Sequence, residues 1–168
     1  MSRQVGKNDS DVPKEQVDLM NKNTAEACAL ACIDFRLVDK TVNQLEQGSS
    51  APFDYTAMPG ASLFVIHPGN PDWKTTYLQT LQTSRNLHSI KGVVVVNHEN
   101  CGAYRLIYPY LIGPDGKIPL PIQKKLAIEN MKETKALIRQ IHPDIYFRGY
   151  FIYLDGTLEL VVKGRAMV

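Results

Sequence analysis

Cysteine is scarce in this chain, which has three cysteines among its 168 residues. An odd number cannot all be paired within one chain, and residues 1–11 are polar, without the apolar stretch of a signal peptide. We therefore expect a cytoplasmic protein with reduced thiols instead of a disulfide framework. Reduced cysteines in a chain that also contains histidines raise the question of metal binding.

Long apolar runs, basic clusters and glycine-rich loops are also missing. The purely apolar runs are as short as Val93 to Val96, too short to cross a bilayer. The net charge is +2, and the longest basic cluster, Lys124-Lys125, suits a solvated helix face better than phosphate binding. No glycine-rich phosphate loop follows an early strand of the predicted fold. The sequence thus gives no support to a membrane, nucleic-acid or nucleotide-binding function.

Apolar runs typical of buried strands alternate along the chain with segments of helical periodicity. We predict strands at 25–34, 53–58, 93–97, 145–154 and 157–162, and helices at 37–47, 72–89, 102–111 and 122–141. This alternation is typical of a mostly parallel central sheet with helices on both faces, and Asp155-Gly156 predicts the turn of an antiparallel C-terminal hairpin. We expect a three-layer α/β domain over residues 24–168, preceded by an N-terminal helical arm at 1–23.

Chemically reactive side chains follow two of these strands. Cys32, Asp34 and Arg36 lie at the C-terminal end of the first strand, and His98 and Cys101 follow the strand at 93–97. If the chain winds in opposite directions after its first two strands, the strands at 25–34 and 93–97 are neighbours. The crevice between their carboxyl ends is then the switch point where open α/β sheets place ligands.

The ligand types of Cys32, His98 and Cys101 suit zinc. Two thiolates and one imidazole leave a fourth tetrahedral position for water, as in catalytic zinc sites. Cys101 also precedes a predicted helix, whose N-terminal dipole favours a thiolate. Each residue alone is better explained as a core cysteine or a loop histidine, whereas the combination favours a zinc site.

Asp34 and Arg36 have the alternate spacing of an extended chain, which would point both side chains to the same side as Cys32. An Asp–Arg pair keeps its carboxylate ionised and oriented, so that next to zinc it can accept a hydrogen bond from the bound water. A salt bridge that closes a loop explains the two residues equally well. Cys28 is expected to be a core residue, too deep in the sheet to share the metal.

The two segments together resemble the signature of the β-class carbonic anhydrases, Cys-x-Asp-x-Arg followed by His-x-x-Cys-Gly. Here they read CIDFR from Cys32 and HENCG from His98. Residues 58–62 fall where that family has a small-residue loop, and residues 149–161 are similar to its closing strand pair. The resemblance covers residues 25–162.

The resemblance implies that Cys32, His98 and Cys101 bind zinc, while Asp34 and Arg36 form a dyad that orients the fourth zinc ligand. The implied activity is the reversible hydration of carbon dioxide to bicarbonate by a zinc-bound hydroxide. The resemblance also implies a homodimer or higher homo-oligomer in which an N-terminal arm crosses to the neighbour, a role that residues 1–23 would take.

The sequence departs from the family pattern at two places, and three alternatives to an open carbonic anhydrase site remain. The family loop usually reads Arg-Asn-Ala-Gly-Asn where this chain has MPGAS, and Asn97 stands where a Gly often precedes the metal-binding His. The ligands do not distinguish a carbonic anhydrase from a hydrolase of carbon disulfide or carbonyl sulfide. A non-catalytic zinc-binding relative is another alternative, although a structural zinc needs no orienting dyad. If Asp34 itself bound zinc, with Arg36 turned away, the site would be closed.

Overall fold

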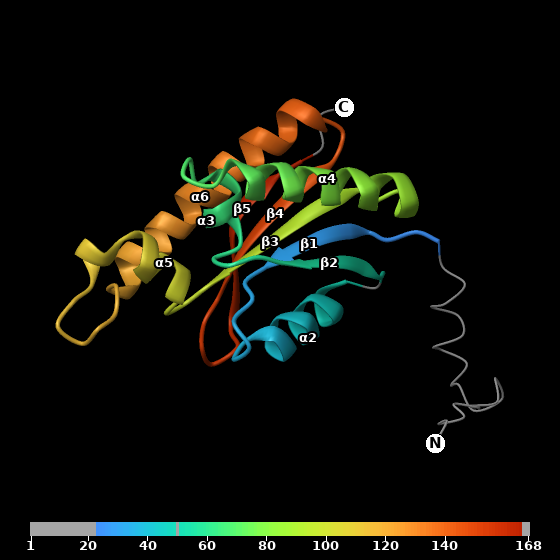
Figure 1. The fold of residues 1–168 in the computed structure, drawn as a ribbon. Coiled ribbons are helices and arrows are strands. Elements are labelled where there is room, and N and C mark those ends of the chain that lie inside the picture. The colour runs from blue at the N-terminus through green and yellow to red at the C-terminus, as the bar shows by residue number, and fades with distance from the viewer. Residues whose placement is uncertain (1–22, 50, 166–168) are drawn as a thin grey trace, which may run out of the picture.

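The computed structural model describes residues 23–49 and 51–165. Its elements alternate between strands and helices along the chain (Figure 1). They are β1 (Ala27–Ala31), α2 (Val38–Gly48), β2 (Phe53–Ala57), α3 (Ser62–Ile66), α4 (Pro71–His88), β3 (Gly92–His98), α5 (Gly102–Ile107), η2 (Pro109–Leu111), α6 (Leu120–Ile141), β4 (Tyr146–Ile152) and β5 (Leu158–Gly164). The predicted arm at 1–23 lies outside the described residues, apart from Asn23.

The five strands form one sheet in the order β2-β1-β3-β4-β5. The first three pairings are parallel and β5 runs antiparallel to β4. This confirms the predicted mostly parallel sheet with an antiparallel C-terminal hairpin. Strands β1 and β3 pair directly, with Ala31 opposite Val96, because the chain adds β2 on one side of β1 and β3 on the other. Their carboxyl ends therefore form the topological switch point of the sheet.

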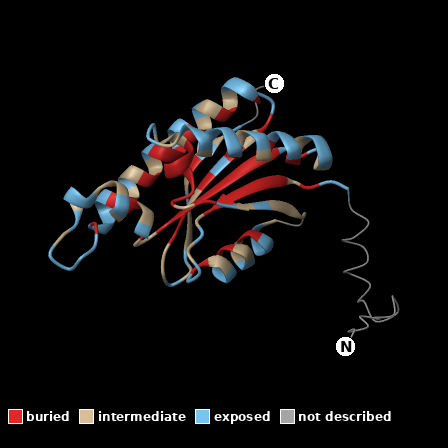
Figure 2. Cartoon of the chain, in the orientation of Figure 1, coloured by how far each residue is buried: buried red, intermediate tan, exposed pale blue. Residues whose placement is uncertain are grey.

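Helices cover both faces of the sheet and complete three layers. Helix α2 lies on one face, and α3, α4 and α6 lie on the other (Figure 1). All residues of β1 and β3 are buried, as Figure 2 shows, because their small and β-branched side chains pack on both sides. Alternate residues serve the two layers. Those on the α2 side include Ala29, Val94 and Leu45, and those on the other side include Leu30, Val95, Leu81 and Met131.

Two segments differ from the sequence prediction. Helix α3 was not predicted, since four of its five residues are apolar and two of these are β-branched, a composition that also suits a strand, and the helix is too short for a helical period. The predicted helix at 102–111 is divided into α5 and the 3-10 turn η2. Pro109 explains the division, because proline disfavours helical conformation in the residue before it and lacks an N–H.

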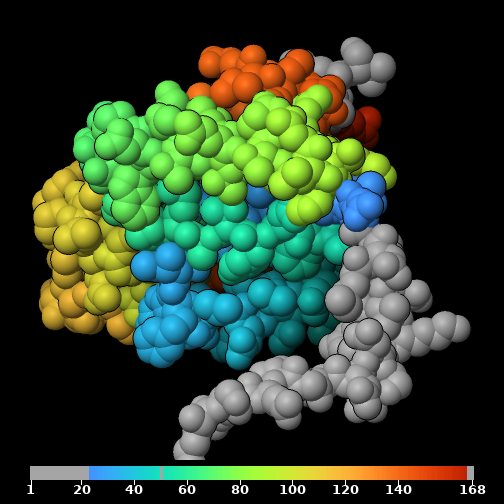
Figure 3. Space-filling view, turned by 45° about the vertical axis from the view of Figure 1, so that its right-hand side comes forward, coloured from blue at the N-terminus to red at the C-terminus, as the bar shows by residue number. Residues whose placement is uncertain are grey.

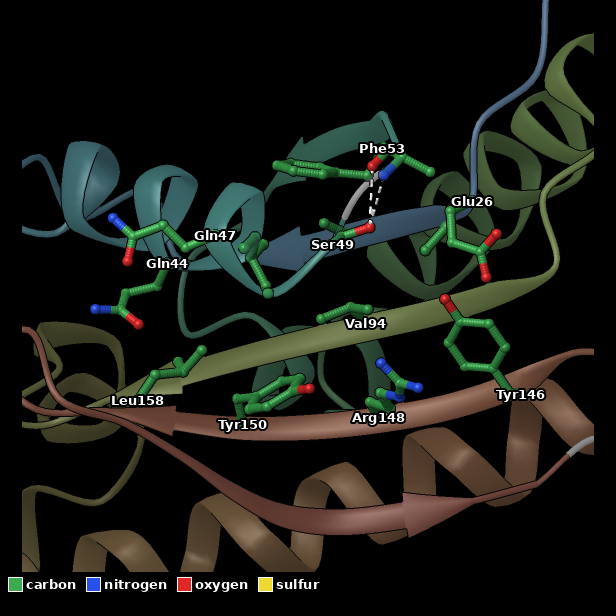
Figure 4. A pocket seen from close by; sticks show the side chains of 15 residues that line it. Glu26, Gln44, Gln47, Ser49, Phe53, Val94, Tyr146, Arg148, Tyr150 and Leu158 are labelled. Carbon is green, nitrogen blue, oxygen red and sulfur yellow. Dashed lines mark hydrogen bonds between the residues drawn. The ribbon is translucent and has the colours of Figure 1, made fainter.

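The α2 side of the sheet is incompletely covered. A cavity of about 600 Å³ opens there between α2 and strands β1, β3 and β4, and it is lined by residues such as Val94, Arg148 and Tyr150 (Figure 4). Figure 3 shows the neighbouring side of the molecule, where α2 and α4 flank the segment of the edge strand β2. Within the described part of the chain, no helix has the length and apolar character needed to cross a membrane.

Candidate metal centre

The predicted ligands come from two segments that the switch point brings together. Cys32 directly follows β1, His98 is the last residue of β3, and Cys101 precedes the first turn of α5. Because β1 and β3 are paired in parallel, their ends present these side chains at the same edge of the sheet. The cavity of Figure 4 is a separate feature, since none of these three residues lines it.

The ligand atoms of Cys32, His98 and Cys101 lie within 4.8 Å of one another. The two Sγ atoms are 3.8 Å apart and both thiols are free. His98 and Cys101 are buried, while Cys32 is partly exposed. Among the residues that the structure describes, no other group of His, Cys, Asp and Glu has this geometry. The cluster is compatible with a metal ion.

The imidazole of His98 is oriented as a metal ligand requires. Its Nδ1 lies 2.8 Å from the carbonyl oxygen of Glu99, and because a carbonyl can only accept, Nδ1 carries the proton. The lone pair is therefore on Nε2. That atom is buried and has no hydrogen-bond partner among the described residues. A buried, unpartnered acceptor is costly unless something binds it, so Nε2 beside two thiols fits a cation.

The contact between the two thiols shifts their pKa values in opposite directions. The pKa of Cys32 is lowered, first by the hydrogen bond from the Cys101 thiol and, to a smaller extent, by the Gly60 N–H, while burial acts in the opposite direction. The pKa of Cys101 is raised, because its proton is held by Cys32 and because it is buried. Gly60 N lies 3.3 Å from Cys32 Sγ. Thiolate sulfur and a neutral imidazole are the donors that zinc and other borderline cations prefer.

Asp34 and Arg36 form a bidentate pair at the edge of this cluster. Arg36 Nε donates to Asp34 Oδ1 at 2.9 Å, and Nη2 donates to Oδ2 at 2.6 Å. The predicted extended geometry is wrong, because the chain turns here and Leu37 N donates to the carbonyl oxygen of Asp34. The hydrogen bonds from Arg36 lower the pKa of Asp34 to about 2. Asp34 Oδ2 is 3.9 Å from His98 Nε2, so an ionised carboxylate borders the cluster.

Several supporting residues were not predicted from the sequence. Asn100, in the turn between β3 and α5, has φ = 54°, and its N–H donates to Oε1 of the buried Gln123 at 2.8 Å. Glu99 Oε2 accepts from Leu154 N at 3.0 Å. These contacts fix the turn that carries His98 and Cys101. The positive φ of Asn100 is typical of asparagine and was a usable signal, whereas the partners in α6 and after β4 depend on tertiary structure.

Comparison with known proteins identifies the family. Residues 22–162 match the family described as "Putative carbonic anhydrase". An uncharacterized protein of Rickettsia bellii is 28% identical over 154 residues, which cover 91% of this chain and 90% of the relative. The chain therefore belongs to this β-carbonic anhydrase-like family.

Solved structures share its fold. The β-carbonic anhydrase isoform I of Trichomonas vaginalis has a TM-score of 0.57 at 16% identity, covering 89% of this chain and 94% of that one. Tetrameric β-carbonic anhydrases of Sordaria macrospora have a TM-score of 0.55 at 12% identity, covering 90% and 87%. The fold is thus that of the β-carbonic anhydrases.

Proposed function

We propose that the protein is a zinc-dependent carbonic anhydrase, with zinc held by Cys32, His98 and Cys101. The observation that carries this proposal is the buried Nε2 of His98, which lies beside two sulfurs and has no hydrogen-bond partner in the described part of the chain. Zinc bound there would act as a Lewis acid that lowers the pKa of a coordinated water toward neutrality. Three protein ligands leave the fourth tetrahedral position for that water, as in catalytic sites.

Asp34 has the role of orienting the group in the fourth position. Its carboxylate is ionised at neutral pH, because its pKa is lowered to about 2 by the hydrogen bonds from Arg36. With Oδ2 only 3.9 Å from His98 Nε2, the carboxylate is placed to accept a hydrogen bond from a hydroxyl in the cluster. An oriented hydroxyl keeps a lone pair directed at carbon dioxide, and this orientation lowers the barrier to attack.

Arg36 supports the open form of the site. In a closed form, Asp34 would turn away from Arg36 and bind the metal itself. In the structure both carboxylate oxygens accept from Arg36, and Arg36 Nη2 also donates to the carbonyl oxygen of Asn100 at 3.1 Å. Closure would break the two charge-assisted hydrogen bonds between Arg36 and Asp34, and the bond to Asn100 holds the guanidinium in place, so both features oppose closure.

We further propose a homo-oligomer in the cytoplasm. The neighbours from Sordaria macrospora are tetrameric. Ile33 and Phe35, which flank Asp34, are exposed, Phe35 by 87%, and such apolar surface beside a site is typical of an interface. A reducing compartment suits three free thiols. Residues 24–168 would form the metal-binding domain, and residues 1–23 an arm that reaches the neighbouring subunit.

Stopped-flow carbon dioxide hydration, on protein of measured zinc content, tests the function. We expect rapid turnover at mildly alkaline pH that is strongly reduced in Asp34→Ala at unchanged zinc content. Zinc-loaded protein without hydration activity over a wide pH range would contradict the proposal. In that case, assays with carbonyl sulfide and carbon disulfide would separate a related hydrolase from a non-catalytic zinc protein.

A further inference from the structure

Asn97 is a buried polar residue directly before the histidine of the cluster. Its exposed fraction is 1%, although it lies near the end of a strand whose other interior positions are valines. In the alternation of β3 it shares the side of Val93 and Val95, which face α3, α4 and α6. A polar side chain in such a position is tolerated only when its hydrogen bonds are satisfied.

The amide of Asn97 uses both its donors and its acceptor. Its Oδ1 accepts from Ser62 Oγ at 2.9 Å and from Ser62 N at 3.4 Å. Its Nδ2 donates to the carbonyl oxygen of Gly60 at 3.3 Å and to Tyr104 Oη at 2.7 Å. The side chain therefore joins β3 to two residues of the MPGAS loop and to α5.

The MPGAS loop reaches the cluster through one peptide N–H. Gly60 N donates to Cys32 Sγ at 3.3 Å. The loop has a strained backbone at this point, with φ = 65° at Gly60 and 48° at Ala61. Strained conformations persist only where the surroundings hold them. Asn97 provides such support, since it contacts Gly60 and Ser62, the residues on either side of Ala61.

We propose that Asn97 is a positioning residue for the metal site, which holds Gly60 so that its N–H donates to Cys32. This inference rests on the proposed zinc ligands. It also accounts for the two departures from the family pattern together, because the asparagine in β3 and the Ser62 of the altered loop are hydrogen-bond partners. The N–H of Gly60 stabilises the thiolate and directs its lone pairs, so removing its support weakens metal binding.

A purely structural role for Asn97 makes a different prediction. In that case the network would contribute to stability alone, and any break in it would have the same consequence. Tyr104→Phe is the matched control, because Tyr104 Oη accepts from Asn97 Nδ2 and from Asn130 Nδ2 at 3.0 Å. This variant removes two buried hydrogen bonds, but leaves every contact between Asn97 and the MPGAS loop in place.

Two measurements test this inference. The first is zinc affinity, measured by competition with a chelator. The second is the thiolate-to-metal charge-transfer band of the Co²⁺-substituted protein. We expect Asn97→Ala to weaken zinc binding by about 10- to 100-fold and to shift the band. Tyr104→Phe should lower stability without changing either quantity. Ser62→Ala retains the backbone contact to Asn97, so it should change the zinc affinity and the charge-transfer band in the same direction as Asn97→Ala, but to a smaller extent. It takes the place of Asn97→Ala in the test if that variant does not fold.

The outcomes separate this inference from the proposed function. The inference is overturned, and the zinc site is unaffected, if Asn97→Ala leaves the zinc affinity and the charge-transfer band unchanged. If only Ser62→Ala folds, the same result in that variant has the same meaning. Equal weakening by Tyr104→Phe would overturn it in favour of a structural role. A wild-type protein that binds neither Zn²⁺ nor Co²⁺ would overturn the proposed function itself, and the positioning role with it.

Discussion

Arg36 donates a hydrogen bond from Nη2 to the carbonyl oxygen of Asn100, and this contact joins the two segments that carry the reactive side chains. The same guanidinium holds both oxygens of Asp34. Its planar fork thus fixes the carboxylate relative to the turn between β3 and α5, which positions His98 and Cys101. The orientation of the dyad depends on contacts across the switch point as well as on the local turn.

This contact leads to a prediction for Arg36→Lys. Lysine keeps the charge but has a single ammonium group, which cannot hold two carboxylate oxygens and a carbonyl in one plane. We expect zinc content to be unchanged and carbon dioxide turnover to fall by about 10²-fold, as misplacement of an orienting group causes. Stopped-flow assays at matched zinc content measure this, and full activity in Arg36→Lys would show that the charge alone suffices.

The ligand assignment predicts which cysteine and histidine changes remove the metal. Cys32→Ser and His98→Ala should lose stoichiometric zinc, because each removes one of three donors. Cys28→Ser is the control, since Cys28 is buried in the core with Thr56 Oγ1 as its neighbour and is not part of the cluster. Metal analysis after dialysis gives the result. Full zinc in Cys32→Ser would contradict the assignment.

Gly60→Ala should destabilise the protein more than Gly116→Ala does. Both glycines have positive φ, at 65° and 73°, so a side chain at either adds strain of about 1–2 kcal/mol. A Cβ at Gly60 would also lie 3.1 Å from Ala103 Cβ and from Leu63 Cβ, whereas nothing lies within 4 Å at Gly116. Urea unfolding of metal-free protein compares the two. If Gly60→Ala and Gly116→Ala lowered the free energy of unfolding equally, the MPGAS loop would have adapted to the added side chain.

His142 predicts a pH dependence of stability. Burial, and then the charge of Arg85, lower its pKa from the ordinary 6.5. Arg85 Nη1 is 3.3 Å from Nδ1, and a guanidinium can only donate, so the neutral ring is the form that fits. Below pH 6.5 the unfolded chain binds the proton more readily than the folded one. The stability contributed by the neutral ring is therefore present above pH 6.5 and lost as pH falls through the lowered pKa.

We therefore expect His142→Asn to flatten the fall in unfolding free energy on the acid side of pH 6.5. The difference in slope is at most about 1.4 kcal/mol per pH unit, the value for one proton. Urea titrations of wild-type and variant protein at a series of pH values measure it. Parallel curves for the two proteins would show that His142 titrates alike in both states.

The sequence allowed the order of strands and helices to be predicted, because the alternation of apolar runs and helical periodicity is local information. The pairing of β1 with β3 was predicted only on the condition that the chain changes its winding direction after the second strand, and the structure shows this pairing. Helix α3 was missed because it is short and stabilised by burial, which has no periodic signal in five residues.

The candidate metal ligands of the site could be predicted from the sequence, because cysteine and histidine are metal ligands by residue type. Two cysteines and a histidine at strand ends pointed to a metal, and the structure brings them together. The bidentate pair of Asp34 and Arg36 was expected, although in an extended segment instead of the observed turn. The contacts of Asn97 with Ser62 and Gly60 were not predictable, because they join residues brought together only by packing α3 against β3.

Because the candidate metal ligands lie at the ends of two strands that are far apart in the sequence, they are not synthesised at the same time. Cys32 leaves the ribosome long before Cys101, and β3 gains its second neighbour only when β4, near the end of the chain, has been made. A nascent chain that ends within α4 holds one of the three donors and can pair β1 with β2, but it lacks β3 and the turn that carries His98 and Cys101. All three donors therefore come together only after β3 has been made and has paired with β1, so metal capture would follow that pairing.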